Sequence, residues 1–161
     1  MIGKTISHYR ILVKLGKGGM GVVYKAEDTK LKRVVALKFL PRQIAASEEE
    51  RERFKIEAQA AAALNHPNIA TIYAIEEVDE EMFIVMEFIE GRELRKFSIE
   101  NCLSYANQIA EGLKAAHAKG ITHRDIKYSN VMVAESGQVK IMDFGLAKIG
   151  AGAHLTKTGI I

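Results

Sequence analysis

Short apolar stretches, separated by glycine-rich or polar turns, predict β-strands in the first third of the chain. Strands are expected at residues 9–15, 22–24 and 34–40, where β-branched residues and alternating apolar positions gather. The turns between them are short, which favours antiparallel pairing of neighbouring strands. We therefore expect a small antiparallel meander at the start of the chain.

A helix is predicted to follow this meander. It should begin after Ser47, which forms a capping-box pattern with Glu50 and precedes an acidic first turn. It should end near Asn65, because Pro67 follows and the residue before a proline avoids helical geometry. The apolar residues that share one face of this helix are Phe54, Ala58, Ala61 and Ala62.

Two further strands and a long helix are predicted in the middle of the chain. The strands lie at residues 69–75 and 82–88, on either side of an acidic turn. The helix is expected at residues 98–119 and should end at Gly120, which suits a left-handed terminal residue. The residues near one face of this helix are Leu103, Ala106, Ala110, Leu113 and His117.

Two short strands complete the pattern, at residues 131–134 and 138–142. The layout is a small sheet with one helix, followed by a mainly helical part, which indicates the α+β class. Such pieces meet in a cleft, and clefts are where ligands usually bind.

Composition narrows the class of protein. The 161 residues are 48% hydrophobic and 27% charged, which is typical of one folded domain or two small lobes and excludes disorder as the main state. The net charge of +3 comes without a cluster of Lys and Arg, so no nucleic-acid partner is expected. No apolar run approaches the roughly 20 residues of a membrane span, so no membrane segment is expected in this chain.

Cysteine usage also narrows the class of protein. Cys102 is the single cysteine, which excludes an internal disulfide and a cysteine-based zinc site. We therefore expect a reducing, cytoplasmic setting. Within the second helix, Cys102 is expected to be a small buried residue.

A glycine-rich stretch separates the first two predicted strands. Residues Gly16-Lys17-Gly18-Gly19-Met20-Gly21 fit the pattern G-x-G-x-x-G, but they lead into a strand rather than a helix. They therefore form the tip of a hairpin, where backbone N–H groups can approach phosphate oxygens. A plain hairpin that needs glycine only for its turn remains the alternative.

One lysine and one glutamate are candidates for an ion pair. Lys38 stands inside an apolar strand, where a buried charge needs a partner. Glu57 lies on the following helix and could reach Lys38 if that helix packs on the sheet. The alternatives are an edge lysine that extends to water and a glutamate on a solvated helix face.

A polar segment and a later aspartate are candidates for phosphate and metal chemistry. The mostly polar residues 123–130 follow the long helix and lie between apolar neighbours. Asp143 follows the last predicted strand. A carboxylate and an amide close to a phosphate cradle could hold Mg²⁺, which prefers oxygen ligands and shares them with phosphates.

These residues coincide with a known pattern. The matching stretches are Gly16-x-Gly18-x-x-Gly21-x-Val23, Val35-Ala36-Leu37-Lys38, Glu57, His66-Pro67-Asn68-Ile69, His123-Arg124-Asp125 with Lys127 and Asn130, and Asp143-Phe144-Gly145. In this order they resemble the eukaryotic-type serine/threonine protein kinases, most of all the bacterial members. The resemblance begins near residue 9 and spans nearly the whole chain.

The resemblance implies ATP and Mg²⁺ as cofactors and gives roles to individual residues. Lys38 would hold the α- and β-phosphates and pair with Glu57. Asn130 and Asp143 would hold magnesium. Asp125 would accept the proton of the substrate hydroxyl or orient that hydroxyl. Lys127 would stabilise the transferring phosphate.

The resemblance also implies an adenine site. Met86 would be the gatekeeper, and the backbone of Glu87 and Ile89 would bond the base. The nucleotide-binding residues as a set would be Leu15, Gly16, Lys17, Gly18, Gly19, Met20, Gly21, Val23, Ala36, Lys38, Met86, Glu87, Ile89 and Met132, with Val23, Ala36 and Met132 sandwiching the ring.

Regulation by phosphorylation is a further implication. Arg124 would pair with a phosphate on the activation segment and so order that segment. Thr156 and Thr158 lie where bacterial members autophosphorylate. Solvated loop threonines are the alternative reading of these two residues.

The implied fold is bilobal, with a five-stranded antiparallel N-lobe carrying one helix and an incomplete, mainly helical C-lobe. The expected boundaries are 9–87 for the N-lobe, 87–91 for the hinge and 92–161 for the partial C-lobe of a single truncated domain, 1–161. Because the sequence ends within the activation segment, exposed apolar surface and self-association are expected.

Two departures from the family pattern stand out. Tyr128 replaces the proline that usually follows Lys127, which is expected to loosen and crowd the catalytic loop. Residues 94–98 are short for the helix that normally follows the hinge, so substrate and ribose contacts there cannot be transferred from the family.

Three functions are compatible with a chain that carries these motifs. The first is ATP-dependent phosphorylation of serine and threonine in protein substrates, including autophosphorylation. The second is a nucleotide-binding, pseudokinase-like interaction module. The third, a small-molecule phosphotransferase, is disfavoured by the Asp125-Ile126-Lys127 arrangement and by the loop that bears the threonines.

Overall fold

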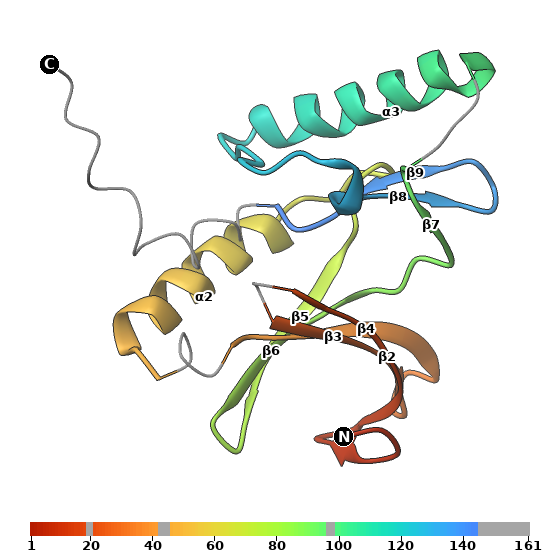
Figure 1. Ribbon diagram of the computed structural model, residues 1–161. Coiled ribbons are helices and arrows are strands. Elements are labelled where there is room, and N and C mark those ends of the chain that lie inside the picture. The colour runs from red at the N-terminus through yellow and green to blue at the C-terminus, as the bar shows by residue number, and fades with distance from the viewer. Residues whose placement is uncertain (19–20, 42–45, 96–98, 145–161) are drawn as a thin grey trace, which may run out of the picture.

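The computed structural model describes residues 1–18, 21–41, 46–95 and 99–144 (Figure 1). A six-stranded sheet forms the first part, in the order β1-β2-β3-β4-β6-β5, and all its neighbouring strands are antiparallel. The strands are β1 (Thr5–Ile6), β2 (Tyr9–Gly18), β3 (Gly21–Asp28), β4 (Arg33–Phe39), β5 (Ile72–Val78) and β6 (Glu81–Glu87). The expected meander is β2, β3 and β4.

Both faces of this sheet are apolar at its centre. Residues 35–39 of β4 and 82–86 of β6 are buried without a break, because side chains of both faces are covered. On one face the rings of Phe39 and Phe83 stack at 4.8 Å, and Tyr9 meets Phe83 edge-on at 6.2 Å. On the other face Ala36, Ile84 and Met86 form a cluster with residues of the helix.

Helix α2 (Glu48–Ala62) covers that second face. Its N-cap is Ser47, whose Oγ accepts a hydrogen bond from the N–H of Glu50 at 3.4 Å, as the capping pattern predicts. Phe54, Ala58 and Ala61 are its buried residues, all from the predicted apolar face. The helix ends at Ala62, a few residues before the predicted end, and Ala63 caps it.

The second part holds a smaller sheet and a longer helix. The sheet has the order β7-β8-β9, formed by β7 (Gly91–Glu93), β8 (Val131–Ala134) and β9 (Val139–Ile141). Helix α3 (Ile99–His117) runs along this sheet, and the short 3₁₀ helix η1 (Tyr128–Asn130) leads into β8 (Figure 1). The α+β layout with two parts is confirmed.

A short segment connects the two parts. Ile69 forms a parallel bridge with Ile141, the N–H of Ile141 donates to Asn68 O at 2.9 Å, and the N–H of Ala70 donates to Ile141 O at 2.9 Å. Residues between α2 and β5 are thereby fixed to β9, next to the aspartate that follows it.

Several sequence expectations need correction. The large sheet has six strands rather than five, because Thr5–Ile6 pairs with the start of β2. Strand β7 was not predicted, since a three-residue strand carries too short a pattern. The strand expected at 69–75 is β5 at Ile72–Val78, because its pairing with β6 sets the register.

The buried face of α3 also differs from the prediction. Leu103 is 82% exposed, whereas Tyr105, Gly112 and Ala116 are buried. The helix approaches β9 at Gly112, where an added Cβ would lie 2.9 Å from Ile141 Cδ1. Cys102, near the start of α3, is exposed rather than buried. Within the described residues, no helix is long and apolar enough to span a membrane.

Candidate active site

Lys38 forms an ion pair with Asp143 at the junction of the two parts. Lys38 lies on β4 and its side chain is only 8% exposed, and its Nζ is 2.7 Å from Oδ2 of Asp143. Asp143 follows β9 with a positive φ of 60°. Because a buried charge without a counter-charge is costly, this pair explains how a lysine is accommodated inside an apolar strand.

Glu57 has a different partner from the one that the resemblance implies. Its Oε1 lies 3.5 Å from a guanidinium nitrogen of Arg124, and among the described residues its Oε2 is buried without a hydrogen bond. The expected Lys38–Glu57 ion pair is not among those of the described residues. Helix α2 is thus tied to the loop of Arg124, while the strand lysine is tied to Asp143.

His123 connects the polar loop to the segment of Asp143. Its Nε2 lies 2.7 Å from the carbonyl oxygen of Met142, and the N–H of Asp125 donates to its Nδ1 at 3.2 Å. Its ring meets that of Phe144 edge-on at 4.7 Å. Burial lowers the pKa of His123 below its ordinary value, which fits a neutral ring that donates from Nε2 and accepts at Nδ1.

Asp125 is the centre of a polar network. Lys127 Nζ lies 2.7 Å from Asp125 Oδ2, and the side-chain amide of Asn130 donates to the same oxygen at 3.1 Å and to Asp125 O at 2.9 Å. The hydrogen bond from Lys127 lowers the pKa of Asp125, and the same contact raises the pKa of Lys127. Asp125 is therefore an ionised carboxylate that can accept a hydrogen bond from a hydroxyl.

Asn130 and Asp143 fit the expected magnesium site. The amide nitrogen of buried Asn130 serves Asp125, which leaves its amide oxygen for a cation. Oδ1 of Asp143 is buried and has no hydrogen-bond partner among the described residues. The N–H of Met142 donates to Asn130 O at 2.8 Å, so the two segments are adjacent.

This donor set is small. In the part of the chain that the structure describes, no three His, Cys, Asp or Glu side chains form a metal-binding group. Two protein oxygens suit Mg²⁺, which keeps waters and shares phosphate oxygens. They do not suit a fully protein-ligated cation.

The glycine-rich stretch is a hairpin, as the sequence predicts. Gly16, Lys17 and Gly18 belong to β2, and Gly18 pairs with Gly21 of β3. An added Cβ at Gly21 would lie 1.8 Å from Phe39 O, and the φ of +112° also requires glycine. At Gly16 an added Cβ would meet nothing within 4 Å, so its backbone borders open space. Gly19 and Met20 lie outside the described residues.

The predicted adenine contacts lie on neighbouring strands. Ala36 and Met86 are buried in one cluster with Val23 packed against it, and Ile89 is also buried. The N–H of Glu87 donates to Thr71 O at 2.8 Å, so this N–H is already engaged within the protein. Met132 is half-buried on β8 and pairs in register with Glu93 and Lys140. Leu15, on β2, is exposed.

Two contacts near these residues were not predicted from the sequence. Lys140 pairs with Glu87 across the junction at 3.0 Å. Arg95 lies 5.3 Å from the ring centre of Tyr128 and pairs with Glu93 at 2.7 Å. The available signal for the first was a lysine between two buried residues of a strand, the same signal that singled out Lys38.

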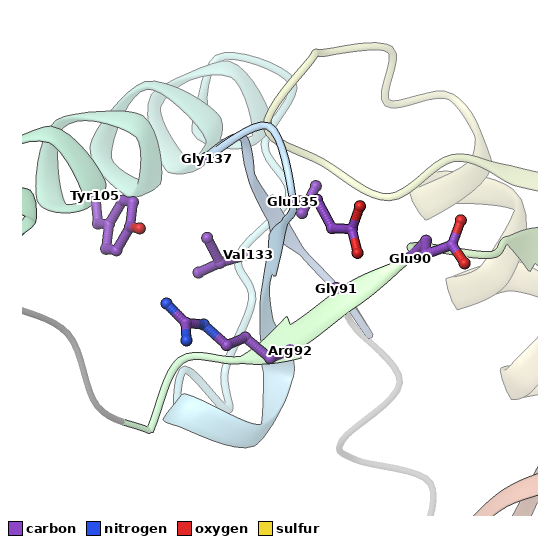
Figure 2. Close-up of a pocket in the computed structure, with 8 residues that line it drawn as sticks. Glu90, Gly91, Arg92, Tyr105, Val133, Glu135 and Gly137 are labelled. Atoms are coloured by element: carbon purple, nitrogen blue, oxygen red, sulfur yellow. The ribbon is translucent and has the colours of Figure 1, made fainter.

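A pocket lies beside β7 and β8. It has a volume of about 540 Å³ and contains none of the predicted site residues (Figure 2). Tyr105 enters it from α3, and the other lining residues, Glu90, Gly91, Arg92, Val133, Ala134, Glu135 and Gly137, belong to β7, to β8 or to the segments beside them. Of the regulatory candidates, Arg124 is exposed, and Thr156 and Thr158 lie outside the described residues.

The site thus combines Lys38 of β4 with the carboxylate of Asp143, which faces it. Beside this pair lies the loop carboxylate Asp125 with its partners Lys127 and Asn130. This set suits phosphoryl transfer, in which positioning and charge stabilisation carry most of the catalysis. The family model of the protein kinase domain, which describes sequences, matches residues 9–159, and the chain belongs to this family.

Similar proteins agree with this assignment. The chain is 40% identical to serine/threonine-protein kinase PrkC of Bacillus subtilis, over 100% of this chain and 26% of PrkC. It is 38% identical to PknD of Mycobacterium tuberculosis, over 98% of this chain and 25% of PknD. The chain therefore spans about a quarter of the length of these relatives.

Solved structures give the same fold. A crystal structure of the kinase domain of PknI from M. tuberculosis matches with a TM-score of 0.79 and 30% identity, over 91% of this chain and 61% of that chain. A second structure of this domain matches with a TM-score of 0.78 and 29% identity, over 91% of this chain and 63% of that chain. The α+β, kinase-like fold is thereby established.

Proposed function

We propose that this chain transfers the γ-phosphoryl group of ATP to serine and threonine hydroxyls of proteins, including its own. The observation that carries the proposal is the network in which Lys127 and Asn130 both hold the carboxylate of Asp125. The Lys38–Asp143 pair next to it places a cation beside a carboxylate that would bind the metal ion.

In this proposal the residues divide the work. Asp125 accepts the hydrogen bond of the substrate hydroxyl and orients its oxygen for in-line attack. It receives the proton as the bond from this oxygen to the γ-phosphorus forms and the bond from the γ-phosphorus to the bridging oxygen breaks, so that ADP leaves. Its lowered pKa makes it an orienting group more than a strong base. Lys127 neutralises charge on the transferring phosphoryl group.

The nucleotide side is proposed on the same grounds. Mg²⁺, when bound, neutralises phosphate charge, and Asn130 and Asp143 would hold it. Lys38 would hold phosphate oxygens, which requires part of its present contact with Asp143 to be exchanged. The backbone around Gly16 and Gly18 would approach the phosphates, and Val23, Ala36 and Met132 would contact the adenine.

Regulation by phosphate is part of the proposal. Arg124 already binds a carboxylate, that of Glu57, and a phosphate is a stronger partner for a guanidinium. Phosphorylation of Thr156 or Thr158 would therefore compete with Glu57 for Arg124.

Labelled ATP with Mg²⁺ tests the activity. We expect label on the protein, identified at Thr156 or Thr158 by peptide mass spectrometry, and loss of label in Asp125→Asn. The matched control is Asp79→Asn, an exposed aspartate in the turn between β5 and β6, which should keep full labelling. A thermal shift with Mg-ATP but no label would instead favour the nucleotide-binding module.

The proposal extends to the cellular setting and to self-association. We propose a cytoplasmic setting, because Cys102 is an exposed free thiol that a reducing compartment preserves.

Self-association is proposed through α3, where Ile99 and Leu103 are 93% and 82% exposed. Sedimentation velocity at rising concentration should show dimers that Leu103→Gln removes, and a concentration-independent monomer would contradict this.

A further inference from the structure

A half-buried ion pair joins the segment of the predicted adenine site to the segment of the predicted metal site. Lys140 is the middle residue of β9, and its Nζ lies 3.0 Å from Oε1 and 3.0 Å from Oε2 of Glu87, the last residue of β6. The two side chains are 13% and 25% exposed. They are 53 positions apart in the sequence, so only the folded structure brings them together.

Glu87 is held from a second direction as well. The N–H of Thr71 donates to Oε2 of Glu87 at 3.1 Å, and the N–H of Glu87 donates to Thr71 O at 2.8 Å. The carboxylate therefore receives both a cation and a backbone donor. A side chain held by these two partners also fixes its own peptide unit, which belongs to the predicted adenine site.

Lys140 is anchored equally well on its own side. The next residue, Ile141, exchanges hydrogen bonds with Asn68 and Ala70, and Met142 bonds to Asn130 and His123. Asp143 follows directly. A displacement of Lys140 would thus be transmitted along β9 to the metal-binding carboxylate.

The cross-strand neighbour of Lys140 strengthens the connection. Lys140 stands opposite Met132 in the β8–β9 register, and directly opposite residues share one face of a sheet. Met132 is the residue of β8 predicted to contact the adenine ring. The aliphatic part of Lys140 therefore lies beside the floor of that site, while its charged end reaches the carboxylate of Glu87.

We propose that Lys140 is a positioning residue for nucleotide binding, acting through Glu87. It holds the adenine-contacting segment at a fixed distance from Asp143, so that base and phosphates are bound together. This inference rests on the proposed function for its site, and it concerns affinity for the nucleotide rather than the transfer step.

The test compares nucleotide affinity with turnover in Lys140→Met, Glu87→Gln, the double variant and Lys140→Arg. We expect Lys140→Met to raise the Kd of a fluorescent N-methylanthraniloyl-ADP and the KM for ATP about five- to tenfold, with kcat within about twofold. The double variant should bind the ADP analogue no more weakly than the weaker of the two single variants, because each single substitution already removes the same ion pair. Lys140→Arg should recover most of the affinity.

The matched control is Lys114→Met, which removes the exposed i,i+3 pair of Lys114 with Glu111 at 3.5 Å on α3. Its Kd for the ADP analogue should equal that of the parent. An unchanged Kd in Lys140→Met overturns the inference, even if its melting temperature falls, because a purely structural pair would change stability alone. If Lys140→Met does not fold, the Kd values of Glu87→Gln and Lys140→Arg decide.

The two proposals fail separately. If Lys140→Met raises the Kd of the ADP analogue but the parent labels no protein, the proposed kinase activity is wrong and this inference stands. A chain that labels protein with the same KM in the parent and in Lys140→Met keeps the activity and loses the inference.

Discussion

Nζ of Lys38 lies 2.7 Å from Oδ2 of Asp143, so the cation of β4 and the carboxylate after β9 neutralise each other across the junction of the two parts. Glu57, the other acid near this junction, is paired with Arg124. Each of these four charges thus has a partner, yet one oxygen of Asp143 and one of Glu57 stay buried without a hydrogen bond among the described residues. These oxygens are where a bound cation or a rearranged lysine would gain most.

Replacement of Lys38 by methionine should remove most of the stabilisation by nucleotide. A ligand at 100 times its Kd stabilises a protein by about 2.7 kcal/mol, and a variant with weak affinity loses nearly all of this. Differential scanning fluorimetry with and without Mg-ATP measures the difference in Tm. The control Lys114→Met should keep the full shift, and an equal shift in Lys38→Met would show that Lys38 does not contact the nucleotide.

The buried carboxylate of Asp28 should make the large sheet sensitive to acid. Burial alone would raise the pKa of Asp28, but hydrogen bonds from the N–H groups of Leu31 and Lys30, with help from His8 and Arg33, lower it overall. A carboxyl whose folded pKa lies below the unfolded value of 3.8 contributes stability above that pH and loses it as the pH falls toward the folded pKa.

Urea unfolding between pH 6 and about pH 2 measures this effect. The parent should lose more stability below about pH 4 than Asp28→Asn, which cannot titrate. Parallel curves for the two proteins over this range would mean that Asp28 has an ordinary pKa. Asp79→Asn, in an exposed turn, should leave the acid slope unchanged.

Tyr128→Pro should be well tolerated, although the sequence suggested that this departure loosens the catalytic loop. Lys127 has φ −155° and ψ 164°, the extended geometry that a residue before proline prefers. Tyr128 begins η1, and the first helical position accepts proline. A gain of about 0.4–1 kcal/mol from a stiffer unfolded chain should offset loss of the contact with Arg95, itself worth about 0.5–1 kcal/mol.

We therefore expect the free energy of unfolding of Tyr128→Pro to lie within about 1 kcal/mol of the parent value. Denaturant titration gives this number directly. A loss of more than about 3 kcal/mol, as for proline in a helix interior, would show that Tyr128 needs its N–H or a different φ. Tyr128→Ala separates loss of the ring from the effect of proline.

Gly112→Ala should destabilise the packing of α3 on the small sheet. The added Cβ would lie 2.9 Å from Ile141 Cδ1 and 3.1 Å from Asn68 O, and the second atom belongs to backbone that is bonded to β9. Overpacking of this kind costs about 1–3 kcal/mol, more than alanine gains over glycine in helix propensity. Thermal unfolding should show the loss, whereas Asn107→Ala on the exposed face should be neutral or slightly stabilising.

The sequence by itself determined most of the local elements and supplied the candidate residues of the site. Apolar spacing predicted α2 and its buried face, because a helix start with a capping box and a 3.6-residue period is a local property. Strand β8 was predicted with its observed bounds, and β4 closely. The resemblance to the kinase motifs likewise pointed to Asp125, Lys127 and Asn130, which are close in the chain and therefore close in space.

Only the tertiary structure decided which distant groups meet. Lys38 could pair with either acid of the junction, and the packing of α2 against the loop of Arg124 left it to Asp143. The inward face of α3 was fixed by the close approach of Gly112 to β9, so that Leu103 turned outward. Glu87 and Lys140 belong to different parts, and no periodicity connects them. Partner choice depends on the distances set by packing, which a local pattern does not contain.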